Sequence, residues 1–144
     1  MLVVVAIISL LAGISFPAIS AGLDSVRLSS AVNSVVSFLN GALNRAERRQ
    51  EVMEVAISVR ENALWLHSIE PGFERKLEMP DGVRIEEILP SLEVEEQGPR
   101  RFLLIPGGTA PRIGIQIGNR RGARRIVRVE PATGMPQVEV PESR

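Results

Sequence analysis

Residues 2–20 read LVVVAIISLLAGISFPAIS and contain no charged residue. A helix rises about 1.5 Å per residue, so this stretch is just long enough to cross a hydrocarbon core of about 30 Å. A cleaved secretory signal has a basic start and a shorter apolar region, and here no basic residue comes first. Although Ala18-Ile19-Ser20-Ala21 has the small residues of a cleavage site, the stretch favours a membrane anchor.

The residues after Pro17 continue a helix instead of forming a loop. Apolar residues recur at steps of three and four, which places them on one helical face: Leu28, Val32, Val35, Leu39, Ala42 and Ala46. Polar residues lie off that face: Asn33, Ser34, Ser37, Asn40 and Asn44. We predict one helix ending near residue 48, apolar all round in its first half and amphipathic in its second. Pro17 lacks a backbone N–H, so we expect a kink or local melting there.

The opening stretch resembles the N-terminal helix of type IV pilins and type II secretion pseudopilins. In that family a leader ending in glycine is followed by a phenylalanine, a short apolar stretch and a glutamate. An apolar run like Leu2–Ile8 then follows, with a proline at the spacing of Pro17. The leader, the phenylalanine and the glutamate are missing here, so we expect the reading frame to continue upstream of Met1. The alternative is an ordinary single-pass anchor.

After Glu47 the helical period gives way to alternation. In VMEVAISV, residues 52–59, Val55, Ile57 and Val59 share one face, and Glu54 and Ser58 share the other. Seven more short β-rich runs follow between turn signals: NALWLHSI, FERKLEM, GVRIEEIL, RRFLLIP, RIGIQIG, RRIVRVE and QVEV. This spacing predicts antiparallel sheets over residues 50–140. The expected fold class is α+β, with the amphipathic half of the helix packed on a β-rich head.

The last third of the chain resembles the H-type minor pseudopilins and T-type fimbrial pilins. The matching elements are a Gly-rich turn, a strand, an arginine-rich hairpin and a closing segment: Pro106–Thr109, Arg112–Ile117, Asn119–Arg125 and Val129–Val138. The resemblance covers residues 2–49 and 100–140, and the middle supports it only by its strand pattern. PSLEVEEQGP, residues 90–99, predicts a polar, acidic loop between two sheet parts.

The resemblance implies a pilin-like fold and a non-enzymatic structural subunit, a minor pseudopilin of a type II secretion pseudopilus. It implies a single pass through the inner membrane by residues 1–22, and a periplasmic head from residues 23–144. Its partners would be other pseudopilins or pilins of the same filament, the inner membrane and, if the leader exists, a prepilin peptidase, with methylation. The alternative is a minor type IV pilin for DNA uptake or adhesion. The residues expected in the membrane and in the filament core are Leu2, Val3, Val4, Val5, Ile7, Ile8, Leu10, Leu11, Gly13, Phe16 and Pro17.

Arginine dominates the C-terminal third. Residues 100–128 contain eight arginines and no acidic residue. Five of them gather around the predicted hairpin: Arg120, Arg121, Arg124, Arg125 and Arg128. Such a patch would attract phosphates or carboxylates, so it suits DNA, an acidic neighbouring subunit or the acidic middle of the chain itself. No aromatic residue is interleaved for base stacking, and we favour subunit contact.

The remaining candidates for chemistry favour structural interpretations. The chain has no cysteine, which excludes disulfides, thiolate metal sites and cysteine nucleophiles. The only histidine, His67, is expected to be a polar strand residue beside Trp65. Gly107-Gly108 lacks the Gly-Lys-Ser/Thr of a phosphate-binding loop and predicts a turn. The acidic clusters are expected to be solvated surface and not a calcium site: Glu86-Glu87 and Glu93/Glu95/Glu96. The sequence therefore predicts no catalytic, cofactor-binding or metal-binding residue.

Overall fold

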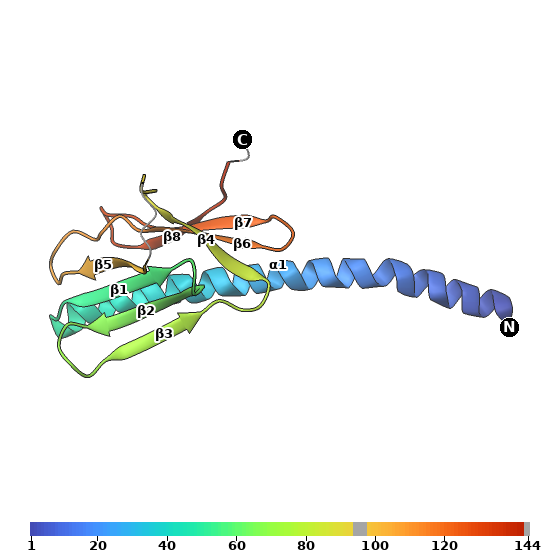
Figure 1. The fold of residues 1–144 in the computed structure, drawn as a ribbon, viewed down its shortest axis with the longest axis horizontal. Helices are drawn as coiled ribbons and strands as arrows, with labels where there is room; N and C mark the ends of the chain where they lie inside the picture. Colours follow the sequence, from blue (N-terminus) through green and yellow to red (C-terminus); the bar gives the residue numbers. More distant parts are fainter. Residues whose placement is uncertain (94–97, 143–144) are drawn as a thin grey trace.

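The computed structural model describes residues 1–93 and 98–142, and for residues 16–18 it describes the backbone alone. One long helix, α1 (Leu2–Arg49), precedes eight strands. The strands are β1 (Met53–Ser58), β2 (Ala63–Ser68), β3 (Glu74–Glu78), β4 (Val83–Leu89), β5 (Arg100–Leu104), β6 (Gly114–Asn119), β7 (Arg124–Val129) and β8 (Pro136–Glu139). All eight predicted strand runs are present, and the predicted α+β fold class is confirmed (Figure 1).

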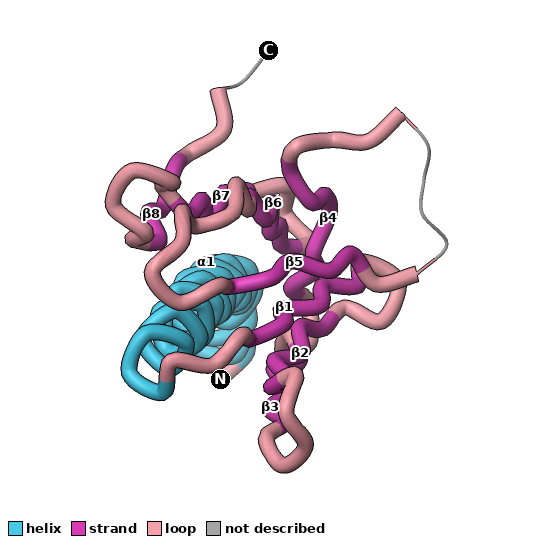
Figure 2. Tube along the Cα trace, turned by 90° about the vertical axis from the view of Figure 1, so that its left-hand side faces the viewer, coloured by secondary structure: helices cyan, strands magenta, loops and turns pink. Residues whose placement is uncertain are grey.

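The strands form two antiparallel sheets, in the orders β3-β2-β1-β5 and β4-β6-β7-β8. Figure 2 views the molecule along α1 and shows the helix in the angle between the two sheets. Only the second half of α1 lies there, and the first half projects away from the head (Figure 1). One continuous helix therefore joins two very different environments.

The apolar face of the second half of α1 forms the centre of the core. The six residues of the predicted stripe are at most 4% exposed: Leu28, Val32, Val35, Leu39, Ala42 and Ala46. They belong to one buried cluster with Val55 and Ile57 of β1, Ile117 of β6 and Val127 of β7. The five polar residues predicted off the stripe are all exposed. Burying a side chain such as Leu39 contributes about 1.5–3 kcal/mol, so this face alone strongly favours docking of the helix on both sheets.

The helix is unbroken from Leu2 to Arg49, so the predicted local melting at residue 17 is wrong. A single missing N–H can be absorbed by gentle bending, and α1 follows a curved path (Figure 1). The helix ends at Gln50, whose φ of 53° is left-handed and whose Nε2 donates to the carbonyl of Glu47. Arg48 and Arg49 in the last turn also suit the negative end of the helix dipole.

Strand β1 ends earlier than the alternating pattern predicted. Val55 and Ile57 are fully buried as expected, but Val59 is 39% exposed and lies in the turn after the strand. Ser58 is buried, and its Oγ accepts a hydrogen bond from the N–H of Glu61 at 3.1 Å. This serine ends the strand by holding the turn, which is why the prediction for Val59 is wrong.

Asn62 in the β1–β2 turn fastens one sheet to the other. Its φ is 54°, a left-handed conformation that asparagine tolerates better than most residues. The side chain donates from Nδ2 to the carbonyl of Val83 at 2.9 Å and accepts from the N–H of Ile85 at 2.8 Å. Because β2 and β4 belong to different sheets, these bonds join the two layers at one end of the head. Strands β4 and β5 belong to different sheets, as predicted for the acidic segment between them, and residues 94–97 of that segment lie outside the described residues.

Candidate functional site

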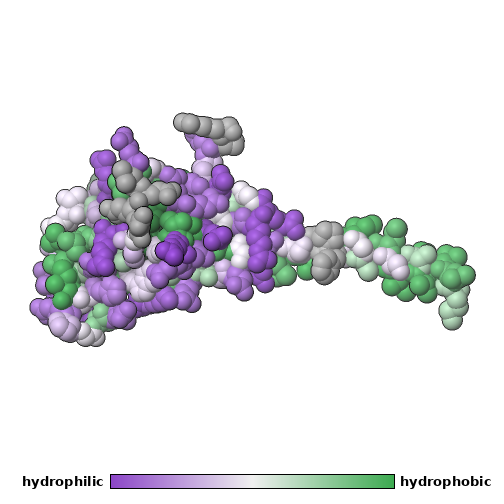
Figure 3. All heavy atoms as spheres, viewed as in Figure 1, coloured by the Kyte–Doolittle hydropathy of each residue, from purple (hydrophilic) through white to green (hydrophobic). Residues whose placement is uncertain are grey.

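The apolar half of α1 is the first candidate surface. Its large side chains are exposed, from Leu2 at 88% to Ile19 at 63%. None of the described side chains of this half is buried, and in the described part of the chain α1 is the one helix long and apolar enough to cross a membrane. Figure 3 shows it as an apolar extension of a largely polar head. Of the predicted membrane residues, Phe16 and Pro17 have side chains outside the described ones.

The few polar side chains of this half bond within the helix itself. Ser9 Oγ donates to the carbonyl of Val5, and Ser15 Oγ donates to that of Leu11, each at 2.8 Å. Gly13 is open, because among the described atoms outside the helix's own nearby backbone none lies within 4 Å of the place a Cβ would occupy. Backbone and hydroxyl groups that bond internally suit a surface surrounded by lipid or by other apolar helices.

The arginine-rich turn between β6 and β7 holds α1 at the boundary between its two halves. Arg121 Nε lies 3.1 Å from Asp24 Oδ2, and Arg121 Nη2 donates to Ser20 Oγ at 2.9 Å. Asn119 donates from Nδ2 to the carbonyl of Asp24 at 3.4 Å. The Asn119 Oδ1 also accepts the N–H groups of Arg121 and Ala123, which shapes the turn. The turn is therefore fixed to Ser20 and Asp24, the polar residues that directly follow the apolar segment.

Two more arginines of the predicted patch pair with carboxylates of this chain. Arg124 Nε on β7 lies 2.9 Å from Glu86 Oε2 on β4, and Gln116 Nε2 donates to the same oxygen. Arg128 Nε lies 3.2 Å from Glu139 Oε2 on β8. These pairs are half-exposed, so each contributes at most about 1 kcal/mol to stability. Their larger effect is to neutralise charge on the outer face of this sheet.

Arg120 and Arg125 differ from the other three. Among the described residues neither forms an ion pair. The exposed Arg120 side chain lies against Gly82, with Nε 3.2 Å from the place a Cβ would take. Arg125 is half-buried and donates from Nη1 to the carbonyl of Arg124. The five arginines thus do not form one unpaired cluster, because three of them face acids of the same chain.

A solved structure is similar to this architecture. The minor pseudopilin EpsH from the type 2 secretion system of Vibrio cholerae matches with a TM-score of 0.62 and 12% sequence identity, over 81% of this chain and 99% of that one. The chain has a pseudopilin-like fold. None of the known protein-family models matches the sequence, and no curated protein matches it. The predicted pilin-like architecture is thereby confirmed at the level of the fold.

The other candidates for chemistry lie on ordinary surface positions of this pseudopilin-like fold. His67 on β2 is 3.9 Å from Glu74 of the neighbouring strand, and Trp65 two residues before it lies under Lys76 at 5.5 Å. Gly107 has a φ of 71° and Gly108 donates to Ile105, which confirms the predicted turn. Across residues 1–93 and 98–142 no three His, Asp or Glu side chains gather to hold a metal ion. Glu95 and Glu96 of the predicted acidic cluster lie outside the described residues.

Sequence reasoning missed the acidic partners of the arginines. Asp24 and Arg121 are far apart in the chain, and only docking of the β6–β7 turn on α1 brings them together. Glu86 sits where the register of β4 shifts between Ile85 and Glu87, a bulge that turns its side chain toward β7. Alternation alone gives no sign of that bulge. One signal was available in the sequence: Asp24 is the only charged residue between residues 2 and 26, and such a carboxylate calls for a basic partner.

Proposed function

We propose that the chain is a non-enzymatic structural subunit, a minor pseudopilin-like component of a type II secretion pseudopilus. The observation that carries this proposal is the joining of an exposed apolar half-helix to a head of pseudopilin-like fold, without a break in α1. Residues 1–22 anchor it as a single pass in the inner membrane, and residues 23–144 form the periplasmic head. Other pseudopilins of the same filament are its partners.

The mechanism follows from the two halves of α1. Lipid tails and Val or Leu side chains are similarly apolar, so moving from lipid into a filament core gains nothing from the hydrophobic effect itself. Close packing between helices decides that exchange, and the open side of Gly13 lets a neighbouring helix approach. The buried face of the second half stays with its own sheets during the exchange, because its stripe is already covered.

Cysteine crosslinking in the membrane tests this proposal, since the chain has no cysteine of its own. Single cysteines replacing Val4, Ile8 or Leu11 should crosslink to the apolar helices of other pseudopilins when the secretion machine is assembled. A matched cysteine at Ser37, on the exposed polar face inside the head region, should not give the same products. Deleting the gene should reduce export of secreted proteins. Crosslinks absent at all three positions, together with normal export in the deletion strain, contradict the proposal.

The arginine pairs within the chain argue against DNA binding by the hairpin. Arg124 and Arg128 would each have to leave a carboxylate of this chain to bind a phosphate through Nε, and Arg121, held by Asp24 and Ser20, would reach a phosphate only through Nη1. The DNA-uptake alternative therefore depends mainly on Arg120 and Arg125, and DNA titrations of a variant at these two positions test it.

A further inference from the structure

We propose that the turn between β6 and β7, together with Arg27 of α1, contacts phospholipid headgroups and seats the head on the membrane surface. This inference rests on the proposed function, because it requires Leu2–Ile19 to lie in the bilayer. The proposed partner of these exposed arginines is the lipid surface, which differs from both a neighbouring subunit and DNA.

The depth of the turn follows from the geometry of α1. The apolar run ends at Ile19 and the first charged residue after it is Asp24, so the edge of the hydrocarbon core lies near Ile19. The headgroup layer adds about 5–8 Å on each side, which is the rise from Ser20 to Asp24. Arg121 contacts the side chains of these two residues at 2.9 and 3.1 Å. A bilayer around the apolar half therefore places the Arg121 guanidinium at the depth of the phosphates.

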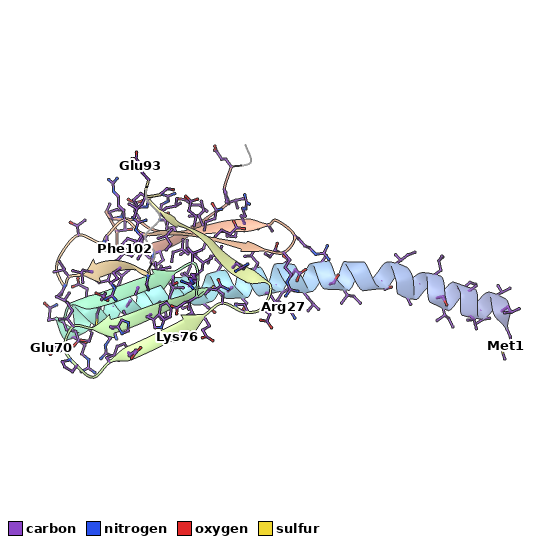
Figure 4. All side chains as sticks on the ribbon, viewed as in Figure 1. Met1, Arg27, Glu70, Lys76, Glu93 and Phe102 are labelled. Carbon is purple, nitrogen blue, oxygen red and sulfur yellow. The ribbon has the colours of Figure 1, made fainter. Side chains whose placement is uncertain are left out.

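The surrounding arginines lie at the same level. Figure 1 shows the β6–β7 turn reaching further toward the N-terminal half of α1 than the other turns of the head. In Figure 4, Arg27 lies on α1 where the helix leaves the head. Arg27, Arg120 and Arg121 are all exposed, and within the described chain Arg27 and Arg120 form no ion pair. Arg27 and Arg121 are therefore exposed beside the headgroup layer, and the Arg120 guanidinium lies slightly behind them, where it packs on Gly82 of the β3–β4 turn.

Nearby acids cancel only part of this charge. Asp24 is already paired with Arg121, which uses its Nε and Nη2 and keeps its Nη1 hydrogens for another acceptor. Glu86 is held by Arg124 and Gln116. Asp81 lines the hollow beside Arg120, in the β3–β4 turn that lies further back along the head (Figure 1). The turn nearest the membrane thus presents cations to it.

A phospholipid phosphate suits this arrangement because it lies close enough to the arginines for a direct contact. A guanidinium binds two phosphate oxygens at once, and each arginine at an anionic surface favours contact by about fivefold. The attraction falls off within a Debye length of about 8 Å. Arg48 and Arg49 at the other end of the head are about 36 Å along the helix from Asp24, so they lie out of range. They provide a matched control with the same change in charge.

Limited trypsin cleavage of the full chain in nanodiscs tests the contact. Trypsin cuts after arginine, and mass spectrometry separates the cut at Arg121–Gly122 from the cuts at Arg48 and Arg49. Nanodiscs of phosphatidylcholine are compared with a phosphatidylcholine–phosphatidylglycerol mixture, at low and at high salt. We expect the Arg121–Gly122 cut to slow by about tenfold or more in the anionic discs at low salt, and to recover at high salt. The cuts at Arg48 and Arg49 should not change.

Two double variants complete the test. Arg27→Gln with Arg120→Gln removes two charges that hold no ion pair in the described chain, so it should release the protection while the fold persists. Arg48→Gln with Arg49→Gln should leave the protection unchanged. A chain that resists carbonate extraction yet is cut at Arg121 equally fast in both discs overturns this inference and leaves the proposed function standing. A chain that carbonate extracts contradicts the proposed function itself. Protection by added duplex DNA, with none from anionic lipid, overturns the inference in favour of a DNA-binding hairpin.

Discussion

Glu86 on β4 pairs with Arg124 on β7, Oε2 to Nε at 2.9 Å, although strand β6 lies between the two. Gly118 of β6 makes this possible, since it stands opposite Arg124 and has no side chain to fill the gap. A Cβ at Gly118 would collide with Glu86 Oε1. The carboxylate therefore crosses a strand by occupying the space of a missing side chain.

Replacing either of two glycines in β6 with alanine should have different costs. In Gly118→Ala the flexible Glu86 carboxylate rotates away, and the lost ion pair is offset by the lower backbone entropy of the unfolded chain, so stability should change by less than about 1 kcal/mol. In Gly114→Ala the new Cβ would lie 2.8 Å from Leu89 Cβ, which is fixed to the backbone of β4. That variant should lose about 1–3 kcal/mol. Urea unfolding of both variants of the full chain in detergent, followed by circular dichroism, measures the difference. An equal loss of stability in both variants would show that the Glu86 side chain cannot rotate away from the new Cβ.

The helix and the strands could be predicted from the sequence because their signals are local. The steps of three and four from Leu28 to Ala46 require one helical face, and that face is the core. The alternation in each β-rich run fixed a strand, except at the end of β1, where the hydroxyl of Ser58 holds a turn and leaves Val59 exposed. A side-chain hydrogen bond of this kind competes with hydrophobic alternation and is not visible in the pattern.

The arrangement of the arginines could not be predicted, because it depends on contacts between distant residues. The sequence indicated one basic patch, but in the fold its arginines point to different partners. Arg121 turns to α1, Arg124 and Arg128 turn to neighbouring strands, and Arg120 lies against the β3–β4 turn. Charge counted along the chain therefore overestimates the charge available to a partner.

Loss of the Asn62 side chain should loosen one sheet from the other. Asn62→Ala leaves the N–H of Ile85 and the carbonyl of Val83 without their partner and puts alanine in a left-handed conformation, so we expect a loss of about 2–4 kcal/mol. Asn62→Asp keeps the acceptor for Ile85 and loses only the donor to Val83, and it should lose less. Thermal unfolding of the full chain in detergent ranks the two. Equal stability of wild type and Asn62→Ala would remove Asn62 as the joint between the sheets.

The contact between Arg121 and Asp24 should give a measurable coupling energy. The Asp24 side chain is only 18% exposed, and Ser20 shares the same guanidinium. A double-mutant cycle of Asp24→Asn and Arg121→Gln should therefore give about 0.5–1 kcal/mol, near the upper end for surface pairs. Arg128 and Glu139 are both nearly half exposed and serve as the control pair, with a smaller coupling expected. A coupling at Asp24 no larger than the control would mean that the turn is held to α1 by packing alone.

Duplex DNA should bind the full chain in neutral nanodiscs only weakly. Three hairpin arginines already contact carboxylates, so a phosphate backbone would find chiefly Arg120 and Arg125, one of them half-buried. We expect non-specific affinity, Kd of roughly 10⁻⁴ M or weaker at physiological salt, and a slope of log K against log salt of no more than about two. Anisotropy titrations at two salt concentrations measure both quantities, in wild type, in Arg120→Gln/Arg125→Gln and in the control Arg48→Gln/Arg49→Gln. Micromolar or tighter binding with a steep salt slope, lost in the hairpin variant and kept in the control, would reverse the preference and favour a pilin that captures DNA. Weak binding that is the same in wild type and in both variants would contradict DNA capture by the hairpin arginines.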